Sequence, residues 1–182
     1  GITLYDARHL LLGERAVPVD ILIKENINIL LISGPNTGGK TVALKTAALM
    51  VLMNQFNLGI PVREGSSLPF FDNVLADIGD GQSIADSLST FSAHMKNISH
   101  ILETGTEKSL ILLDEPAAGM NPSETTELMH QIRRIRDTFQ IAIFLIEHDM
   151  NLVMNVCETI AVVNYGRIIA KGTPDEIREN PA

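Results

Sequence analysis

Eight consecutive residues combine glycines with a lysine and a threonine at a spacing that suits phosphate binding. They fit the pattern G-x-x-x-x-G-K-[ST] without a gap: Gly34, Pro35, Asn36, Thr37, Gly38, Gly39, Lys40 and Thr41. Glycines let the backbone wrap a phosphate with successive N–H groups, and a helix N-terminus adds positive potential for an anion. The flanking residues suit this use, since an apolar run precedes the motif and a long run without Gly or Pro follows it.

This loop predicts a site for ATP with Mg²⁺. We expect the Lys40 ammonium to bridge the β- and γ-phosphates and the Thr41 hydroxyl to ligate Mg²⁺. Val42 follows directly and is included among the nucleotide-binding residues. The competing interpretation is an ordinary glycine-rich turn between a strand and a helix.

An acidic pair supplies the second half of the expected site. The apolar run Leu110–Leu113 leads into Asp114 and Glu115, and a buried strand would deliver both to its carboxyl end, beside the phosphate loop. We expect Asp114 to hold Mg²⁺, directly or through water, and Glu115 to orient or deprotonate the attacking water. The alternative is a surface turn with no role in metal binding.

Two further residues are candidates for this site. His148 follows a third apolar run, where its side chain would reach the γ-phosphate from a neighbouring strand end. Gln82 is a candidate for contact with water or Mg²⁺, or else an exposed loop residue. The other histidines have no such support and are interpreted as structural: His9, His94, His100 and His130.

The predicted elements alternate between strands and helices, which favours an α/β fold with a mainly parallel sheet covered on both faces. Buried strands are expected at 28–33, 110–113 and 141–146, two further strands at 160–163 and 167–170, and short strands at a sheet edge within 1–25. Helices are expected from Lys40 to about Asn54, from a cap at Ser89 or Thr90, from a cap at Asn121, after residue 149 and from a cap at Thr173. Residues 59–73 contain two prolines and two glycines and are expected to be mostly loop.

Composition limits the classes of partner. The chain has 182 residues and is expected to form one domain, 1–182. Its net charge is −8, and the only basic cluster, Arg133, Arg134 and Arg136, is interpreted as a solvated helix face, so nucleic acid is not an expected partner. No apolar run is long enough to span a membrane, and the single cysteine, Cys157, is expected to be buried, so a cytoplasmic location is predicted.

Residues from about 3 to 108 resemble the ATPase domain of the second bacterial MutS branch. The matching stretches are 7–9 (ARH), 33–46 (SGPNTGGKTVALKT), 71–80 (FDNVLADIGD) and 82–94 (QSIADSLSTFSAH). From about residue 110 to the end, the chain resembles ABC transporter ATPases of the branched-chain amino-acid importer type, in 113–122 (LDEPAAGMNP), 145–150 (LIEHDM) and 165–174 (YGRIIAKGTP). A MutS protein is expected to have Leu-Gly-Ala-Gly-Thr-Asp-Pro after the acidic pair and a Thr-Thr-His segment, and this chain has neither.

These two resemblances lead to the hypothesis of an engineered chimera, with a MutS-like segment 1–110 and a transporter-like segment 110–182. Both families imply a P-loop NTPase fold of the ABC-ATPase type. They also imply a head-to-tail homodimer in which Ser89 reaches the γ-phosphate bound by the other subunit, with Asn121 at the dimer contact; as an ordinary helix cap, Ser89 needs no ligand.

Three functions remain open. The first is Mg²⁺-dependent ATP hydrolysis by Lys40, Thr41, Asp114, Glu115 and His148. The second is a nucleotide-binding scaffold without significant turnover. The third, natural DNA processing or transport, is disfavoured because the family segments that touch DNA or membrane are not found in the sequence. The preference for ATP over GTP is open, and Tyr5 and His9 are candidates for stacking on the adenine.

Overall fold

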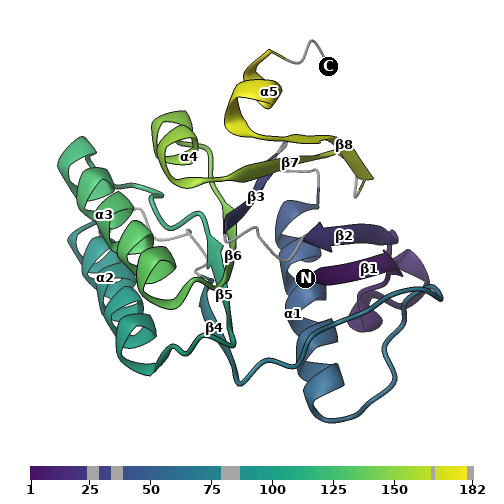
Figure 1. The fold of residues 1–182 in the computed structure, drawn as a ribbon. Helices are drawn as coiled ribbons and strands as arrows, with labels where there is room; N and C mark the ends of the chain where they lie inside the picture. The colour runs from purple at the N-terminus through teal and green to yellow at the C-terminus, as the bar shows by residue number, and fades with distance from the viewer. Residues whose placement is uncertain (24–28, 34–38, 79–86, 165–166, 180–182) are drawn as a thin grey trace.

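The computed structural model describes residues 1–23, 29–33, 39–78, 87–164 and 167–179. These residues form a six-stranded sheet and a separate two-stranded sheet (Figure 1). The predicted α/β class with a mostly parallel sheet and short antiparallel strands near the N-terminus is confirmed.

The larger sheet has the strand order β4-β5-β6-β3-β7-β8. Its strands are β3 (Ile29–Ser33), β4 (Asn73–Ile78), β5 (Ser109–Asp114), β6 (Ala142–Ile146), β7 (Thr159–Asn164) and β8 (Arg167–Gly172). All neighbours are parallel except β7 and β8. The carboxyl ends of β3, β5 and β6 therefore lie side by side.

Alternate residues of the central strands enter two different cores. Leu112 of β5 and Phe144 of β6 pack on the side of α1 (Lys40–Gln55), whereas Ile111 and Leu113 pack on the opposite side. That opposite face is covered by α2 (Ser87–Thr104), α3 (Pro122–Phe139) and α4 (Met150–Val156) (Figure 1). Burial on both faces explains why these strands are continuously apolar in sequence.

The strands β1 (Ile2–Ala7) and β2 (Val19–Ile23) form an antiparallel pair of their own. The short 3₁₀ helix η1 (Leu10–Arg15) connects them. Their alternate apolar residues, such as Leu4 and Ile21, belong to the core on the α1 side. The short strands predicted within 1–25 are thus present, and they form a sheet of their own whose buried face packs against α1 and its core.

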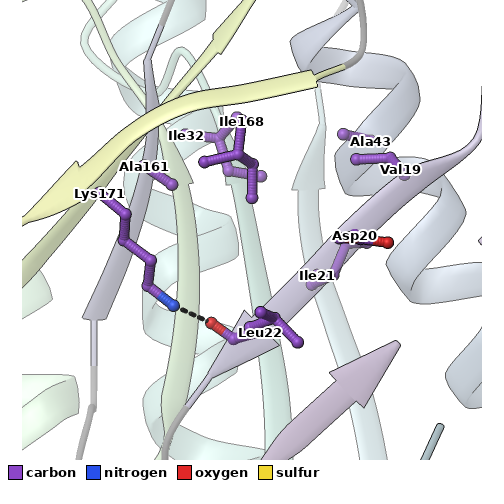
Figure 2. A pocket seen from close by; sticks show the side chains of 9 residues that line it. All are labelled: Val19, Asp20, Ile21, Leu22, Ile32, Ala43, Ala161, Ile168 and Lys171. Atoms are coloured by element: carbon purple, nitrogen blue, oxygen red, sulfur yellow. Dashed lines mark hydrogen bonds between the residues drawn. The ribbon is translucent and has the colours of Figure 1, made fainter. Parts of the chain in front are cut away.

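A small cavity lies between this pair and the main sheet (Figure 2). It holds about 20 Å³, room for about one water molecule. The Lys171 ammonium of β8 donates a hydrogen bond to the Leu22 carbonyl beside it, which links the two sheets (Figure 2). None of the residues that line the cavity belongs to the predicted nucleotide site.

One strand and one helix start differ from the prediction. Strand β4 was not expected, although four of its six residues are apolar (NVLADI); Asp77 interrupts that apolar run and is the strand's only fully buried residue. Helix α2 begins at Ser87, so Ser89 is its third residue and not its cap; such shifts are common at helix ends.

The remaining predicted helix starts are confirmed. The Asn121 side chain accepts from the N–H groups of Ser123 and Glu124, and the Glu124 carboxylate accepts from the Asn121 N–H. A second capping box, between Thr173 and Glu176, begins α5 (Pro174–Arg178). No helix within the described ranges has the length and apolar character needed to cross a bilayer.

Candidate nucleotide site

The end of the phosphate loop is placed by a left-handed glycine. Gly39 has φ 83° and precedes α1, whose first residue is Lys40. Glycine adopts this conformation without the penalty that a Cβ brings. Residues 34–38, which carry most of the predicted loop, lie outside the described residues, as does Gln82.

Three groups from separate parts of the sequence meet at the carboxyl edge of the sheet. The Nε2 atom of His148 lies 3.0 Å from Nζ of Lys40 and 2.8 Å from Oε1 of Glu115. A neutral imidazole Nε2 either accepts from the ammonium or donates to the carboxylate, and a protonated ring only donates. The structure thus joins the three residues that were predicted to work on the γ-phosphate.

Lys40 is almost fully buried, with 3% of its surface exposed. Burial lowers the pKa of its ammonium, and the nearby carboxylates of Glu115 and Asp114 oppose that change. A buried cation with two carboxylates beside it is suited to exchange its partners for an anionic ligand.

Asp114 faces the start of α1. Burial raises the pKa of its carboxyl, and a hydrogen bond from the Thr41 hydroxyl lowers it; Glu115 raises it further, whereas Lys45 and Lys40 lower it. A carboxylate and a hydroxyl are oxygen ligands of the kind that Mg²⁺ uses, with water and substrate phosphates completing the shell. These two residues fit the predicted metal role, although the described residues contain no cluster of three or more His, Cys, Asp or Glu side chains arranged for a metal.

A buried glutamate, Glu147, joins the two loops that carry Glu115 and His148. Its Oε1 accepts from the Ala117 N–H at 2.9 Å, and its Oε2 accepts from the N–H groups of His148 at 2.7 Å and Asp149 at 3.0 Å. The sequence analysis assigned Glu147 no role. Its position between a buried strand and His148 could have marked it as a candidate.

A second buried cluster attaches α2 to β4. Asp77 accepts from Asn97 Nδ2 at 2.7 Å, and its other oxygen lies 2.5 Å from Nδ1 of His94. Asp77 is paired in register with Leu113, one residue before Asp114. His94 is thus buried and paired with Asp77, in line with its interpretation as a structural histidine. The sequence analysis did not identify Asp77.

Other candidates are occupied elsewhere or lie apart. One face of the Tyr5 ring carries the Arg63 guanidinium, 5.0 Å from the ring centre. The Nδ1 atom of His9 is buried and has no hydrogen-bond partner among the described residues. Val42 is 41% exposed on α1.

The residues outside the site also have defined partners. Arg133 donates to the Asn155 carbonyl and Arg136 to Asp137. Cys157 is buried, as expected, and burial raises the pKa of its thiol to about 12, with smaller contributions from Glu147 and Glu158.

The parallel sheet, the lysine at the start of α1 and the acidic residues at the end of β5 define the class of protein: a P-loop ATPase-type domain. The family model for MutS domain V matches residues 30–180, and the chain belongs to this family.

Three relatives, each named Endonuclease MutS2, show how far the similarity extends. The protein of Finegoldia magna is 53% identical over 131 residues, which cover 71% of this chain and 17% of the relative. That of Pelotomaculum thermopropionicum is 55% identical over 125 residues, 69% of this chain and 16% of the relative. That of Clostridium botulinum (strain Okra) is 42% identical over 180 residues, 98% of this chain and 21% of the relative. The chain thus spans about a fifth of the length of these relatives or less.

These matches overturn the hypothesis of an engineered chimera. The family model and the Clostridium botulinum relative both run without interruption across residue 110, where the junction was expected. The likeness to transporter ATPases rested on three short stretches, 113–122, 145–150 and 165–174, and no separate transporter portion is supported.

The exclusion of nucleic acid is also wrong. It rested on the net charge of this chain and on the interpretation of its one basic cluster as a solvated helix face, whereas the relatives are named as endonucleases. A net charge of −8 describes the average surface and does not exclude a part in a larger protein that acts on nucleic acid.

Proposed function

We propose that this chain binds ATP with Mg²⁺ at the shared carboxyl edge of β3, β5 and β6 and hydrolyses it to ADP and phosphate. The meeting of Lys40, Glu115 and His148 within hydrogen-bond distance supports this proposal most directly. These residues are 33 to 108 positions apart in sequence, and only a site that acts on one ligand gives a ready reason for their convergence.

Each residue has a proposed part in the reaction. Lys40 leaves His148 and binds phosphate oxygens, and Thr41 and Asp114 hold Mg²⁺, which neutralises charge on the phosphates when bound. Glu115 orients the water and takes its proton as the oxygen attacks the γ-phosphorus and the bond to the ADP oxygen breaks. His148, which lies beside Glu115, donates its Nε2–H to the γ-phosphate.

Binding without significant turnover is the second candidate, and one observation favours it. Lys40 is nearly buried and in contact with His148, so nucleotide binding must first break an existing contact. Groups that remain misplaced by about 1 Å after that change would lower the rate about 10²-fold.

Two measurements separate these candidates. Fluorescent-nucleotide binding should be lost in Lys40→Ala and retained in Glu115→Gln, and phosphate release should be lost in both. Binding with no release that depends on Glu115 would leave only the scaffold function. Retained binding in Lys40→Ala would refute the site itself.

We further propose that ATP turnover by this chain serves a protein that processes nucleic acid, in line with the names of its relatives. Phosphate release should rise when duplex or single-stranded DNA is added, and the rise should shrink with salt, since contacts to phosphate are screened. An unchanged rate across DNA types and salt concentrations would refute direct coupling through this chain.

The proposed role of Ser89 requires a second copy of the chain. Light scattering should detect a dimer of Glu115→Gln with Mg·ATP, and not with Mg·ADP. The dimer should weaken in the Glu115→Gln, Ser89→Ala double variant. A monomer under all conditions would leave Ser89 as an ordinary residue of α2. The ABC type of the core, expected from the resemblance, stays a prediction.

A further inference from the structure

A single buried carboxylate lies between the two loops that carry Glu115 and His148. Glu147 is 4% exposed and follows β6 directly. Both of its oxygens are used: one accepts from the loop after β5, and the other accepts from two successive N–H groups of the loop after β6. Three backbone N–H groups from two loops thus converge on one buried carboxylate.

The backbone around Glu115 needs such support. Glu115 has φ 50°, which is a left-handed backbone conformation. Any residue other than glycine adopts this conformation at a cost in free energy. Pro116 follows it. Its N–H donates to the Ile146 carbonyl at 2.9 Å, and its carbonyl accepts from the Ala118 N–H at 3.0 Å. Between the residues that make these two bonds lies Ala117, whose N–H donates to the Glu147 carboxylate.

The same carboxylate also holds the backbone of His148. Its own N–H and that of Asp149 converge on one Glu147 oxygen. The Asp149 side chain in turn accepts from the Leu152 N–H and caps α4. The His148 backbone is thus held between a buried charge and a helix start, while its ring remains free to contact Glu115 and Lys40.

We propose that Glu147 is the positioning residue of this site: it holds the Glu115 loop and the His148 loop at a fixed separation, so that the carboxylate and the imidazole stay in contact. This inference rests on the proposed function for its effect on turnover. The effect on the Glu115–His148 contact itself does not depend on turnover.

The contact is tested by NMR in the whole chain. In the unmodified chain, Glu115→Gln should shift the ring resonances of His148, because it replaces the group 2.8 Å from Nε2. In a Glu147→Ala background, the same substitution should have little effect on that ring. An equal shift in both backgrounds would overturn the proposal, even if the chain has no ATPase activity.

Amide exchange and kinetics complete the test. Exchange should accelerate at least tenfold in Glu147→Gln either at Ala117 or at both His148 and Asp149, because an amide group offers one acceptor oxygen where the carboxylate offers two. If the chain hydrolyses ATP, kcat should fall about 10- to 100-fold with nucleotide affinity within twofold. An unchanged kcat in a folded variant would contradict the positioning role, whereas an inactive parent chain would contradict the proposed function alone.

A matched control is available in α5. Glu176 also accepts a backbone N–H, that of Thr173 at 2.7 Å, and α5 contacts β7 and β8. Glu176→Gln should leave the His148 resonances and kcat unchanged. If Glu147→Ala does not fold, Glu147→Gln, which keeps the side-chain volume, carries the same NMR comparison.

Discussion

The hydrogen bond from Thr41 to Asp114 joins the start of α1 to the end of β5, and its removal makes a quantitative prediction. Thr41→Val keeps the branched shape of the side chain and deletes only the hydroxyl. Asp114, with 8% of its surface exposed, then loses a donor that water replaces poorly.

A hydrogen bond to a charged group contributes about 1.5–3 kcal/mol. Lys40 and Lys45 remain near Asp114 and compensate in part, so we expect a loss of about 2 kcal/mol in the free energy of unfolding at neutral pH. For a chain of this size, that corresponds to a fall in Tm of roughly 4–8 °C.

The loss should depend on pH in a defined direction. The pKa of Asp114 is raised in the folded state, so the folded protein binds this proton more tightly than the unfolded chain, and ionised Asp114 costs stability at neutral pH. Thr41→Val raises that pKa further. The difference between variant and parent should therefore be largest at neutral pH and shrink as the pH falls through the raised pKa.

Urea unfolding followed by circular dichroism from pH 8 to pH 4 measures this difference. Thr46→Val is the matched control: it deletes a hydroxyl on the same helix that bonds only the Val42 carbonyl. Its cost should be about 0.5–1.5 kcal/mol and independent of pH. A Thr41→Val loss that is equally independent of pH, or absent, would refute the assigned bond to Asp114.

Three further predictions concern stability and accessibility. Asn121→Ala should lower the free energy of unfolding by about 1 kcal/mol in urea titrations, because it removes a helix cap; no loss would contradict the capping role. Asp77→Asn should cost more, about 1.5–3 kcal/mol, since it weakens the buried hydrogen bonds of this carboxylate with His94 and Asn97; a loss below about 0.5 kcal/mol would show that the amide replaces the carboxylate at no cost. Cys157 should react with a thiol reagent at pH 8 only after urea unfolding, because its thiol is buried and has a pKa of about 12; rapid reaction of the native chain would contradict this burial.

Most of the fold was predictable because its signals are local. Continuous apolar runs marked β3, β5 and β6, and the Asn121 and Thr173 caps marked two helix starts. Strand β4 was missed although its sequence, NVLADI, is mostly apolar; it is short and follows directly on the segment 59–73 that was expected to be loop. The separate β1–β2 pair escaped because alternation predicts a half-buried strand but not the surface on which it packs.

The hypothesis of two joined families shows the limit of short motifs. The segment after Asp114 and Glu115 and the segment before His148 departed from what the family was expected to have, yet the family model extends across both. Short motifs report only neighbours along the chain. The bond between the Ala117 N–H and the Glu147 carboxylate joins residues 30 positions apart, so no local pattern contains both.

The sequence by itself determined the phosphate-loop motif, the acidic pair and the strands that carry them, because spacing and apolar runs depend on neighbours along the chain. Only the tertiary structure decided that Lys40, Glu115 and His148 contact one another, and that Glu147 lies between two loops with both oxygens in use. The physical reason is the order of the strands: β3 lies beside β6 in the sheet, although β4 and β5 come between them in the chain. Hydrogen bonds across their ends form only after that order is set.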